Sequence, residues 1–396
     1  MIRRAIPTAV LLLAVLCAGI WLGGRHPDAL PGPVRDALVG DQDTRVVTEA
    51  IDEVGRDYYR KVPQSKLADE AIRGMVRSLD DRFSTYFDPA EYRRFQEVQD
   101  SEFSGIGVTV SQDQRGLRVS QVFDESPAKR AGIVRGDLIT AVNGTALKGR
   151  TQEQSVALIK GRNGTDVTLR IVHDGKARDV DLVRQTIEVP VVASRLVTHD
   201  GRKLAVISLA QFSSGAHAEL YRAIKRAEKR GAQGIVLDLR GNGGGLVTEA
   251  QLVASAFLKD GKIVTTKGRS VPTRTLEATG DPVAGNTPLV VLVDRDTASA
   301  SEIVAGALQD RDRAELVGTN TFGKGVFQQV IELSNGGALD ITAGQYFTPN
   351  GRNLGGQGVS QGSGLTPDVR AKDDPKTPKR DEALDRALTA LAHEGA

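Results

Sequence analysis

The sequence is short of the residues that most often build disulfides, metal sites and nucleic-acid surfaces. Among 396 residues there is one cysteine, so no disulfide can form within the chain and a cysteine-built zinc site is excluded. Only five residues are histidines, and aromatic residues make up 4% of the chain, which argues against base-stacking surfaces. Lys and Arg number 52 against 50 Asp and Glu, and this net charge of +2 argues against a nucleic-acid binder that neutralises phosphates.

Glycine is the residue in excess, with 43 copies, above the average usage of roughly 7%. The chain is long enough for two or three domains. We therefore expect chemistry that uses glycine-shaped backbone, serine, lysine and carboxylates, with no metal and no cofactor.

The N-terminal residues 1–24 have the pattern of a signal peptide or membrane anchor. Arg3 and Arg4 precede the uncharged run AVLLLAVLCAGIWLGG, which contains the single cysteine, Cys17. The run is shorter than the roughly 20 residues of a comfortable membrane span, and both interpretations stay open. Either one predicts an extracytoplasmic protein, secreted or anchored to the membrane by this segment.

The texture of the remaining chain predicts a multidomain α/β fold with α+β parts. Residues 25–43 read as a linker, and residues 44–103 show helical spacing of apolar residues, interrupted at Pro63, which indicates a helical N-terminal arm. Short strands with glycine turns and two helices follow at 104–185. Strands and helices alternate over 186–370 and predict an α/β core with a partly parallel sheet, before a charged linker and C-terminal helix at 371–396.

A glycine-rich turn, DLRGNGGGL, follows a predicted buried strand at residues 238–246. Glycines let backbone amides approach a ligand closely, and the N-terminus of the helix that follows carries partial positive charge. The turn could hold a developing oxyanion, or it could be a plain sharp turn.

A second strand-to-helix turn carries the sequence DTASASE at residues 296–302. A serine at such an elbow is exposed at the carboxyl end of the strand, where nucleophiles are presented, and the amide of Ala300 would point into the same space. Serine is also an ordinary helix cap. Ser299 and Ser301 could therefore divide the roles of nucleophile and cap.

Lys324 lies between two glycines in the apolar segment 318–328. Removal from water lowers the pKa of a lysine, and a neutral lysine can take a proton from a serine hydroxyl. A solvated or phosphate-binding turn lysine is the alternative. None of His173, His199 and His217 lies in a motif, so a Ser–His–Asp triad is unsupported, whereas Ser–Lys is a known variant of this constellation.

The segment SGIGV at residues 104–108 opens the region of short strands. Consecutive amides around its two glycines can form a nest for a carboxylate. The strand that follows offers an edge for an extended peptide. A strand start that merely contains glycine is the alternative.

Together these segments resemble the C-terminal processing peptidases, also called tail-specific proteases, over about residues 45–370. SGIGV, SPAKRAGIVRGDLITAVNG and TQEQSVALIKGRNGT are similar to that family's PDZ domain, and LDLRGNGGGL, TASASEIVAGALQD, TFGKGVFQ and YFTPNGR follow in the family's order. Two segments depart from the pattern: DDRFSTYF (80–87) carries Arg82, and GQGVSQGSGLTPDV (356–369) is long. Neither contains a residue to which the resemblance gives a catalytic role.

The resemblance implies a serine nucleophile at Ser299 and a lysine base at Lys324, with Gln328 positioning the lysine. It also implies an oxyanion hole made by the amide of Ala300 and that of either Gly243 or Gly244. Four residues at the start of the PDZ domain would bind the substrate tail: Gly105, Ile106, Gly107 and Val108.

The function so implied is an extracytoplasmic serine endopeptidase that cleaves proteins near their C-termini. Its partners would be protein substrates with exposed C-terminal tails, and the resemblance also raises a homodimer, a regulatory partner and membrane attachment through an uncleaved N-terminal segment. The alternative is a catalytically inactive PDZ adaptor that presents protein tails to another enzyme. A third, weaker reading is an acyl-transfer or hydratase enzyme on a related α/β scaffold.

Overall fold

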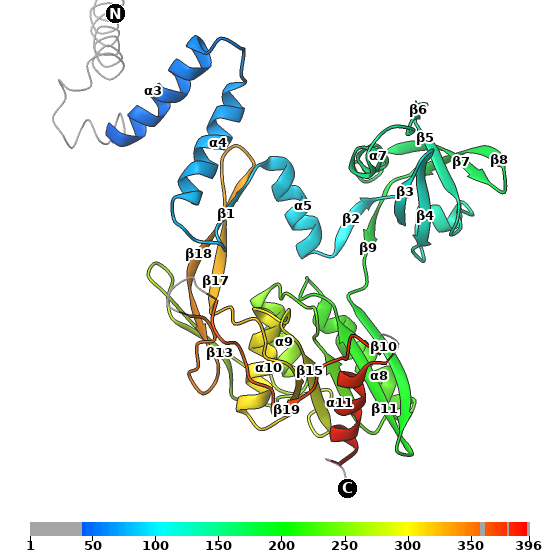
Figure 1. Cartoon of the computed structure of the whole chain (residues 1–396), viewed down its shortest axis with the longest axis vertical. Coiled ribbons are helices and arrows are strands. Elements are labelled where there is room, and N and C mark those ends of the chain that lie inside the picture. The colour runs from blue at the N-terminus through cyan, green and yellow to red at the C-terminus, as the bar shows by residue number, and fades with distance from the viewer. Residues whose placement is uncertain (1–41, 357–360, 378–379, 394–396) are drawn as a thin grey trace, which may run out of the picture. The chain divides into compact units, whose positions relative to one another are not determined.

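The structure is a computed structural model that describes residues 42–356, 361–377 and 380–393 (Figure 1). The chain divides into two compact units, Met1–Asp80 and Asp81–Ala396. The predicted signal or anchor segment 1–24 and nearly all of the linker 25–43 lie outside the described residues. In the part of the chain that the structure describes, no helix is both long and apolar enough to cross a membrane.

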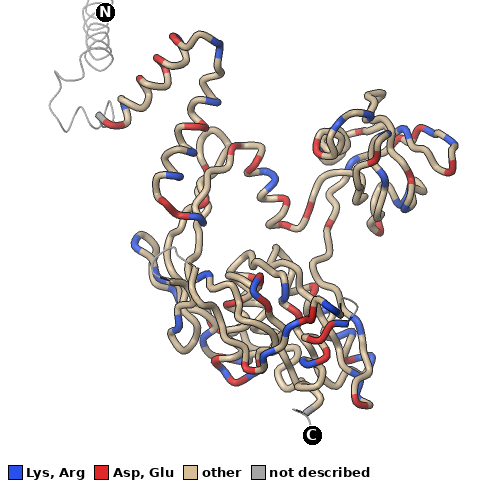
Figure 2. Tube along the Cα trace, viewed as in Figure 1, with Lys and Arg blue, Asp and Glu red and all other residues tan. Residues whose placement is uncertain are grey.

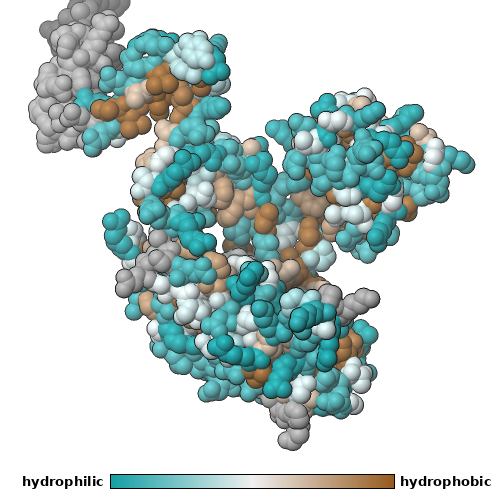
Figure 3. Space-filling view, viewed as in Figure 1, coloured by the Kyte–Doolittle hydropathy of each residue, from teal (hydrophilic) through white to brown (hydrophobic). Residues whose placement is uncertain are grey.

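Two helices form the described part of the N-terminal unit, α3 (Gln42–Asp57) and α4 (Gln64–Arg77). Pro63 stands immediately before α4 with φ −60°, the angle that its ring imposes, and so separates the two helices as the sequence predicts. Large apolar side chains of these helices are exposed, and Figure 3 shows apolar surface gathered over them. The exposed side chains on the helices are Val46, Val47, Val54 and Met75.

A short strand follows the N-terminal unit, and the sequence did not predict it. This strand, β1 (Thr85–Phe87), pairs antiparallel with β18 (Ala338–Phe347). Helix α5 (Pro89–Gln99) comes next and begins with a capping box in which Asp88 accepts the amides of Ala90 and Glu91. The predicted arm 44–103 thus contains three helices and also a strand that belongs to a distant sheet.

Short strands and two helices form the PDZ-like region, as predicted. Its main sheet has the order β3-β4-β5-β7-β8, with β6 beside β5, while β2 pairs with β9. The helices are α6 (Pro127–Arg130) and α7 (Gln152–Ile159). The strands are β2 (Glu102–Gly105), β3 (Val108–Asp113), β4 (Gly116–Val122), β5 (Leu138–Val142), β6 (Thr145–Ala146), β7 (Asp166–His173), β8 (Lys176–Val183) and β9 (Gln185–Glu188). Because β3 lies at one end of this order, it offers a free edge.

A six-stranded sheet follows the PDZ-like region along the chain and has the order β10-β11-β12-β15-β16-β19. All neighbours are parallel except β10 and β11, so the predicted partly parallel α/β core is confirmed. The strands are β10 (Val192–His199), β11 (Arg202–Leu209), β12 (Ile235–Asp238), β15 (Leu289–Val293), β16 (Glu315–Gly318) and β19 (Val369–Arg370).

Helices cover both faces of this sheet, which explains why β12 and β15 are apolar runs without alternation. Side chains of α8 (Ala216–Lys229), α9 (Val247–Ser255) and α10 (Ala300–Asp310) share one core with the strands. Helix α11 (Glu382–His393) builds a second core on strand residues that alternate with the first set. Figure 1 shows α11 in red beside the sheet.

A second sheet carries the segment around Lys324. It has the order β1-β18-β13-β14, with β17 also paired to β18. The remaining strands are β13 (Lys262–Gly268), β14 (Arg274–Glu277) and β17 (Val326–Glu332). The register of β17 against β18 shifts between Phe327 and Gln328, and this irregularity sets Gln328 opposite Thr342.

Candidate active site

Ser299 lies at the elbow between the loop after β15 and the first residue of α10. Its backbone has φ 56° and ψ −116°, a region that residues other than glycine rarely adopt and that persists only where surrounding structure imposes it. The side chain is half-buried, whereas Ser301 is fully buried and its Oγ donates to the carbonyl oxygen of Asn242 at 2.9 Å. Of the two candidate serines, Ser301 is therefore a structural tie, and Ser299 is the one that a substrate can reach.

The glycine-rich turn lies directly against Ser299. A Cβ added to Gly244, whose φ is +105°, would come within 2.8 Å of the Ser299 Cβ and 2.9 Å of the Ala300 amide nitrogen. Asn242, which is fully buried, shapes this turn: its Nδ2 donates to the Leu209 carbonyl and its carbonyl oxygen accepts the Ala298 amide. Only glycine fits at position 244.

Two backbone amides near Ser299 are unused. The Gly244 amide donates to Asn242 Oδ1 at 2.9 Å, and Gly244 is buried. Gly243 is exposed, and neither its amide nor that of Ala300 has an acceptor within the described residues. Ala300 opens α10, where the first amides of a helix are free to meet negative charge. Of the two predicted glycines, Gly243 has the available donor.

One buried carboxylate, that of Glu302, ties the elbow to the lysine segment. Its Oε2 accepts the amide of Ser299 at 3.0 Å and that of Lys324 at 2.9 Å, and its Oε1 accepts the Gly323 amide at 2.7 Å. The Thr321 hydroxyl donates to the same oxygen at 2.5 Å. Burial raises the pKa of Glu302, and these hydrogen bonds oppose that shift. The backbones of Ser299 and Lys324 thus share one acceptor.

Lys324 is largely withdrawn from water. Burial lowers the pKa of its amine, and the negative charges of Asp340, Asp81 and Glu302 oppose that shift without cancelling it. The amine also lies 5.0 Å from the centre of the Phe83 ring. A lowered pKa raises the fraction of neutral amine at a given pH, which is the form that can accept a proton.

Gln328 holds the amine of Lys324. The Lys324 Nζ donates to Gln328 Oε1 at 2.6 Å, and Gln328 Nε2 donates to Thr342 Oγ1 at 3.1 Å. The structure therefore brings the predicted pair of Lys324 and Gln328 into direct contact.

The predicted tail-binding segment lines a groove of about 370 Å³ between β3 and α7. Gly105, Ile106 and Val108 line it, while Gly107, with φ +78°, passes so close to Ser126 that a side chain would collide. Apolar side chains of α7 form the opposite wall, and Lys160 adds a cation. The arrangement suits an apolar peptide end with a carboxylate.

Models of three protein families match the chain. Residues 203–371 match peptidase family S41, residues 104–183 match a PDZ domain, and residues 34–90 match the N-terminal domain of the activating protease CtpB.

Two relatives cover most of its length. The carboxy-terminal processing protease CtpA of Bacillus subtilis (strain 168) is 34% identical over 352 residues, which is 88% of this chain and 74% of that protein. A carboxy-terminal-processing protease of Bartonella bacilliformis is 37% identical over 322 residues, 79% of this chain and 72% of that protein. The chain belongs to the carboxy-terminal processing protease family.

As a carboxy-terminal processing protease, the chain is a serine protease with a PDZ domain, which confirms the family and the fold class expected from its motifs. The fold also resembles that of a putative S41 protease from Bacteroides fragilis NCTC 9343, with a TM-score of 0.50 and 19% identity. That match covers 87% of this chain and 97% of the other.

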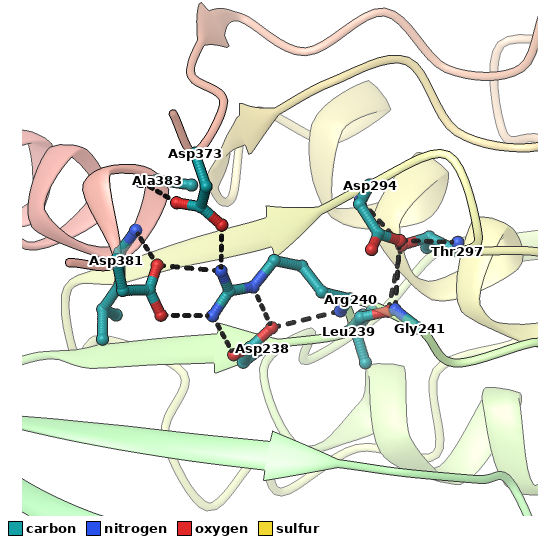
Figure 4. A network of polar contacts seen from close by, with 10 residues as sticks. Asp238, Leu239, Arg240, Gly241, Asp294, Thr297, Asp373, Asp381 and Ala383 are labelled. Carbon is teal, nitrogen blue, oxygen red and sulfur yellow. Dashed lines mark hydrogen bonds and ion pairs between the residues drawn. The ribbon is translucent and has the colours of Figure 1, made fainter. Parts of the chain in front are cut away.

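In this processing protease a partly buried ion network holds the first residues of the glycine-rich turn (Figure 4). The Arg240 guanidinium donates to both carboxylate oxygens of Asp238, at 3.0 and 2.8 Å, and to both of Asp381, at 2.9 Å each. Asp373 lies 3.7 Å away. Burial acts to lower the pKa of Arg240, but the hydrogen bonds to the carboxylates raise it above its usual value. The network joins β12 to the start of α11.

Sequence reasoning missed several residues that shape the site. Glu302 stands three positions after Ser299, the spacing of a capping box, and that signal could have found it. Arg240 gave no comparable signal, because its partner Asp381 lies far along the chain. Lys160 gave none either, because its place in the wall of the groove has no pattern in the sequence.

Proposed function

We propose that the chain is an extracytoplasmic serine endopeptidase that cleaves proteins near their C-termini, with Ser299 as nucleophile and Lys324 as base. The observation that carries this proposal is the Glu302 carboxylate, which accepts the amides of both residues. The lowered pKa of Lys324 supports it as well, since burial favours the neutral amine. The proposed location outside the cytoplasm rests on the charged start and apolar run of residues 1–24.

In the proposed reaction the neutral Lys324 amine takes the proton of Ser299 Oγ as this oxygen attacks the scissile carbonyl. The amides of Gly243 and Ala300 donate to the oxyanion of the tetrahedral intermediate. The Lys324 ammonium then gives its proton to the leaving amine, which breaks the peptide bond. Water then attacks the acyl-enzyme as the same lysine takes its proton, and the ammonium returns that proton to Ser299 Oγ as the ester bond breaks.

Capture of the substrate tail is assigned to the groove between β3 and α7. The free edge of β3 would pair with an extended C-terminal segment, while Ile106, Val156 and Ile159 surround its apolar last residues. The terminal carboxylate would meet the amides of Gly107 and Val108. Lys160, which now pairs with Glu97 at 2.6 Å, would add positive charge.

The exposed apolar faces of α3 and α4 support a partner surface in the N-terminal unit. A second copy of the chain and a regulatory protein are the two partners proposed for it. Attachment to a membrane through residues 1–24 is proposed for the case in which that segment is not removed.

Cleavage of a protein mixture, followed by mass spectrometry of the products, tests the proposal. Wild type is expected to shorten proteins at their C-termini, whereas Ser299→Ala and Lys324→Met should each lose at least about 10³-fold in rate with the fold intact. Ser334→Ala and Lys259→Met change an exposed serine and an exposed lysine elsewhere and should match wild type.

A serine-directed covalent probe separates the protease from the adaptor. A protease should be labelled at Ser299, and Lys324→Met should slow the labelling. A wild-type chain that binds tail peptides but neither cleaves them nor reacts with the probe would establish the adaptor instead.

A further inference from the structure

The hydrogen bonds that hold the base do not stop at Gln328. Gln328 Nε2 donates to Thr342 Oγ1 at 3.1 Å, and the Thr342 hydroxyl lies close enough to Asp81 to lower the pKa of that carboxylate. The Ser84 hydroxyl donates to Asp81 Oδ2 at 2.5 Å and accepts the Thr342 amide at 3.0 Å. The chain of contacts therefore runs from the Lys324 amine back to the first residue of the second compact unit.

The donor and acceptor of every hydrogen bond in this series are set by Asp81, at the end away from Lys324. An ionised carboxylate only accepts hydrogen bonds, so Asp81 obliges the Thr342 hydroxyl to donate. The lone pairs of that hydroxyl then accept from the amide nitrogen of Gln328. This turns the amide oxygen of Gln328 toward the Lys324 amine, where it accepts at 2.6 Å. With the amide reversed, its nitrogen would donate to the lone pair of the neutral amine, which is the electron pair that must take the proton.

Asp81 is built to remain ionised. Burial acts to raise its pKa, but hydrogen bonds from Ser84, Thr342 and the Phe83 amide bring the pKa below its usual value. The Phe83 amide donates to Asp81 Oδ1 at 2.9 Å, and the ring of the same residue lies 5.0 Å from the Lys324 amine. One loop thus fixes the amine by a relay and by direct contact.

We propose that Asp81, Ser84 and Thr342 are positioning residues of the Lys324 base, which act by fixing the orientation of the Gln328 amide. This inference rests on the proposed function. It gives a role to the segment DDRFSTYF, which the catalytic residues leave without one. The pairing of β1 with β18, Thr85 opposite Asp340, holds the loop in register with Thr342.

Steady-state kinetics on the full chain test the relay. Thr342→Val removes the hydroxyl at nearly constant volume and should lower kcat by about 10- to 100-fold with KM within about twofold, because the base is displaced. Thr342→Ser restores the hydroxyl and should recover most of the rate. Gln329→Ala, a change at the exposed neighbour of Gln328, should behave as wild type.

Asp81→Asn supplies an independent readout. It should lower kcat to a similar extent and also move the acid limb of the pH profile to lower pH. The reason is that Lys324 loses one of three facing negative charges while Asp340 and Glu302 remain. Asp80→Asn is the matched control at an exposed neighbour and should leave the limb in place.

If a thermal melt shows that Thr342→Val or Asp81→Asn does not fold, Ser84→Ala replaces that variant. Ser84→Ala deletes one oxygen and should also lower kcat. Turnover within twofold of wild type in folded Thr342→Val, Asp81→Asn or Ser84→Ala would overturn the relay. A wild-type chain without Ser299-dependent cleavage would refute the proposed function itself, so the two failures are distinguishable.

Discussion

At the residue scale, the surroundings of Lys324 favour the neutral amine that its proposed role as base requires. Its amine lies among Asp340, Asp81 and Glu302, which favour the charged form, yet burial outweighs them and the pKa stays below the usual value of 10.5. In the proposed reaction the carboxylates offer a nearby countercharge once the amine has accepted the proton of Ser299.

The lowered pKa of Lys324 predicts the pH dependence of the reaction. Only the neutral amine accepts a proton, so kcat/KM should rise with pH and level off above the folded-state pKa of Lys324, at a pH below 10.5. At pH values below that pKa, kcat/KM should fall about tenfold per pH unit. The measurement is kcat/KM on a tailed substrate between pH 5 and pH 10.

Lys324→Arg is the control for this profile. A guanidinium stays protonated throughout the range, so the variant should be inactive at every pH while retaining its thermal melt. A profile that is flat across the range in wild type would contradict the role of Lys324 as base.

At the scale of elements, the two turns that form the site are tied together by Asp294 and by side chains of the turns themselves. Asp294 Oδ1 accepts the amides of Gly241 and Thr297, each at 3.0 Å, and the Thr297 hydroxyl donates to the Leu239 carbonyl at 2.9 Å. These bonds tie the turn after β12 to the turn after β15. Arg240 extends the same support to α11 through Asp381 (Figure 4).

Asp381 both holds Arg240 and begins α11, and two substitutions separate these roles. Its Oδ1 accepts the Leu384 amide at 2.8 Å, as a helix cap does. Asp381→Ala should lower the free energy of unfolding by about 1–3 kcal/mol, whereas Asp381→Asn keeps a good cap and should lose less. Urea unfolding followed by circular dichroism measures both.

The acid dependence of this stability has a definite sign. Burial acts to raise the pKa of Asp381, but the hydrogen bonds from Arg240 and the Leu384 amide bring it below its usual value. The ionised carboxylate therefore stabilises the fold fully above the unfolded-state pKa near 3.8, and this contribution is lost as the pH falls through the lower folded value. Equal urea midpoints for wild type and Asp381→Ala at pH 7 would show that Arg240 does not secure α11.

The sequence predicted the helices and strands whose apolar residues recur at regular spacing. The alternation of apolar strands and amphipathic helices predicted the core from β11 to α10. The strand-to-helix turns pointed to the two serines of residues 296–302 and to the glycine-rich turn, and the family resemblance then singled out Ser299. Strand β1 was not predicted, because its three residues show no periodicity and its partner β18 lies about 250 positions away. Contacts such as those of Thr342 with Asp81 and of Arg240 with Asp381 are set by folding and leave no spacing in the sequence.

At the scale of the whole molecule, charge does not select the partner. Figure 2 shows acidic and basic residues interspersed along the described chain, in keeping with a net charge of +2. A substrate must then be recognised by contact, and the described surface offers an apolar groove with a free strand edge beside α7. The proposed recognition in the PDZ domain and the proposed chemistry at Ser299 use different residues, so they can be altered separately.

Tail binding can be measured on the full-length Ser299→Ala chain, which does not consume its ligand. A fluorescent peptide with an apolar C-terminus should bind. The same peptide with a C-terminal amide should bind at least about tenfold more weakly, because it loses the proposed hydrogen bonds of the carboxylate to the amides of Gly107 and Val108. Val156→Lys places a charge in the groove and should weaken binding to a similar extent, whereas Val134→Lys, at an exposed valine outside the groove, should not. Equal affinity for acid and amide would show that the chain end is not what the groove recognises, and tails would then have to be selected by their internal sequence.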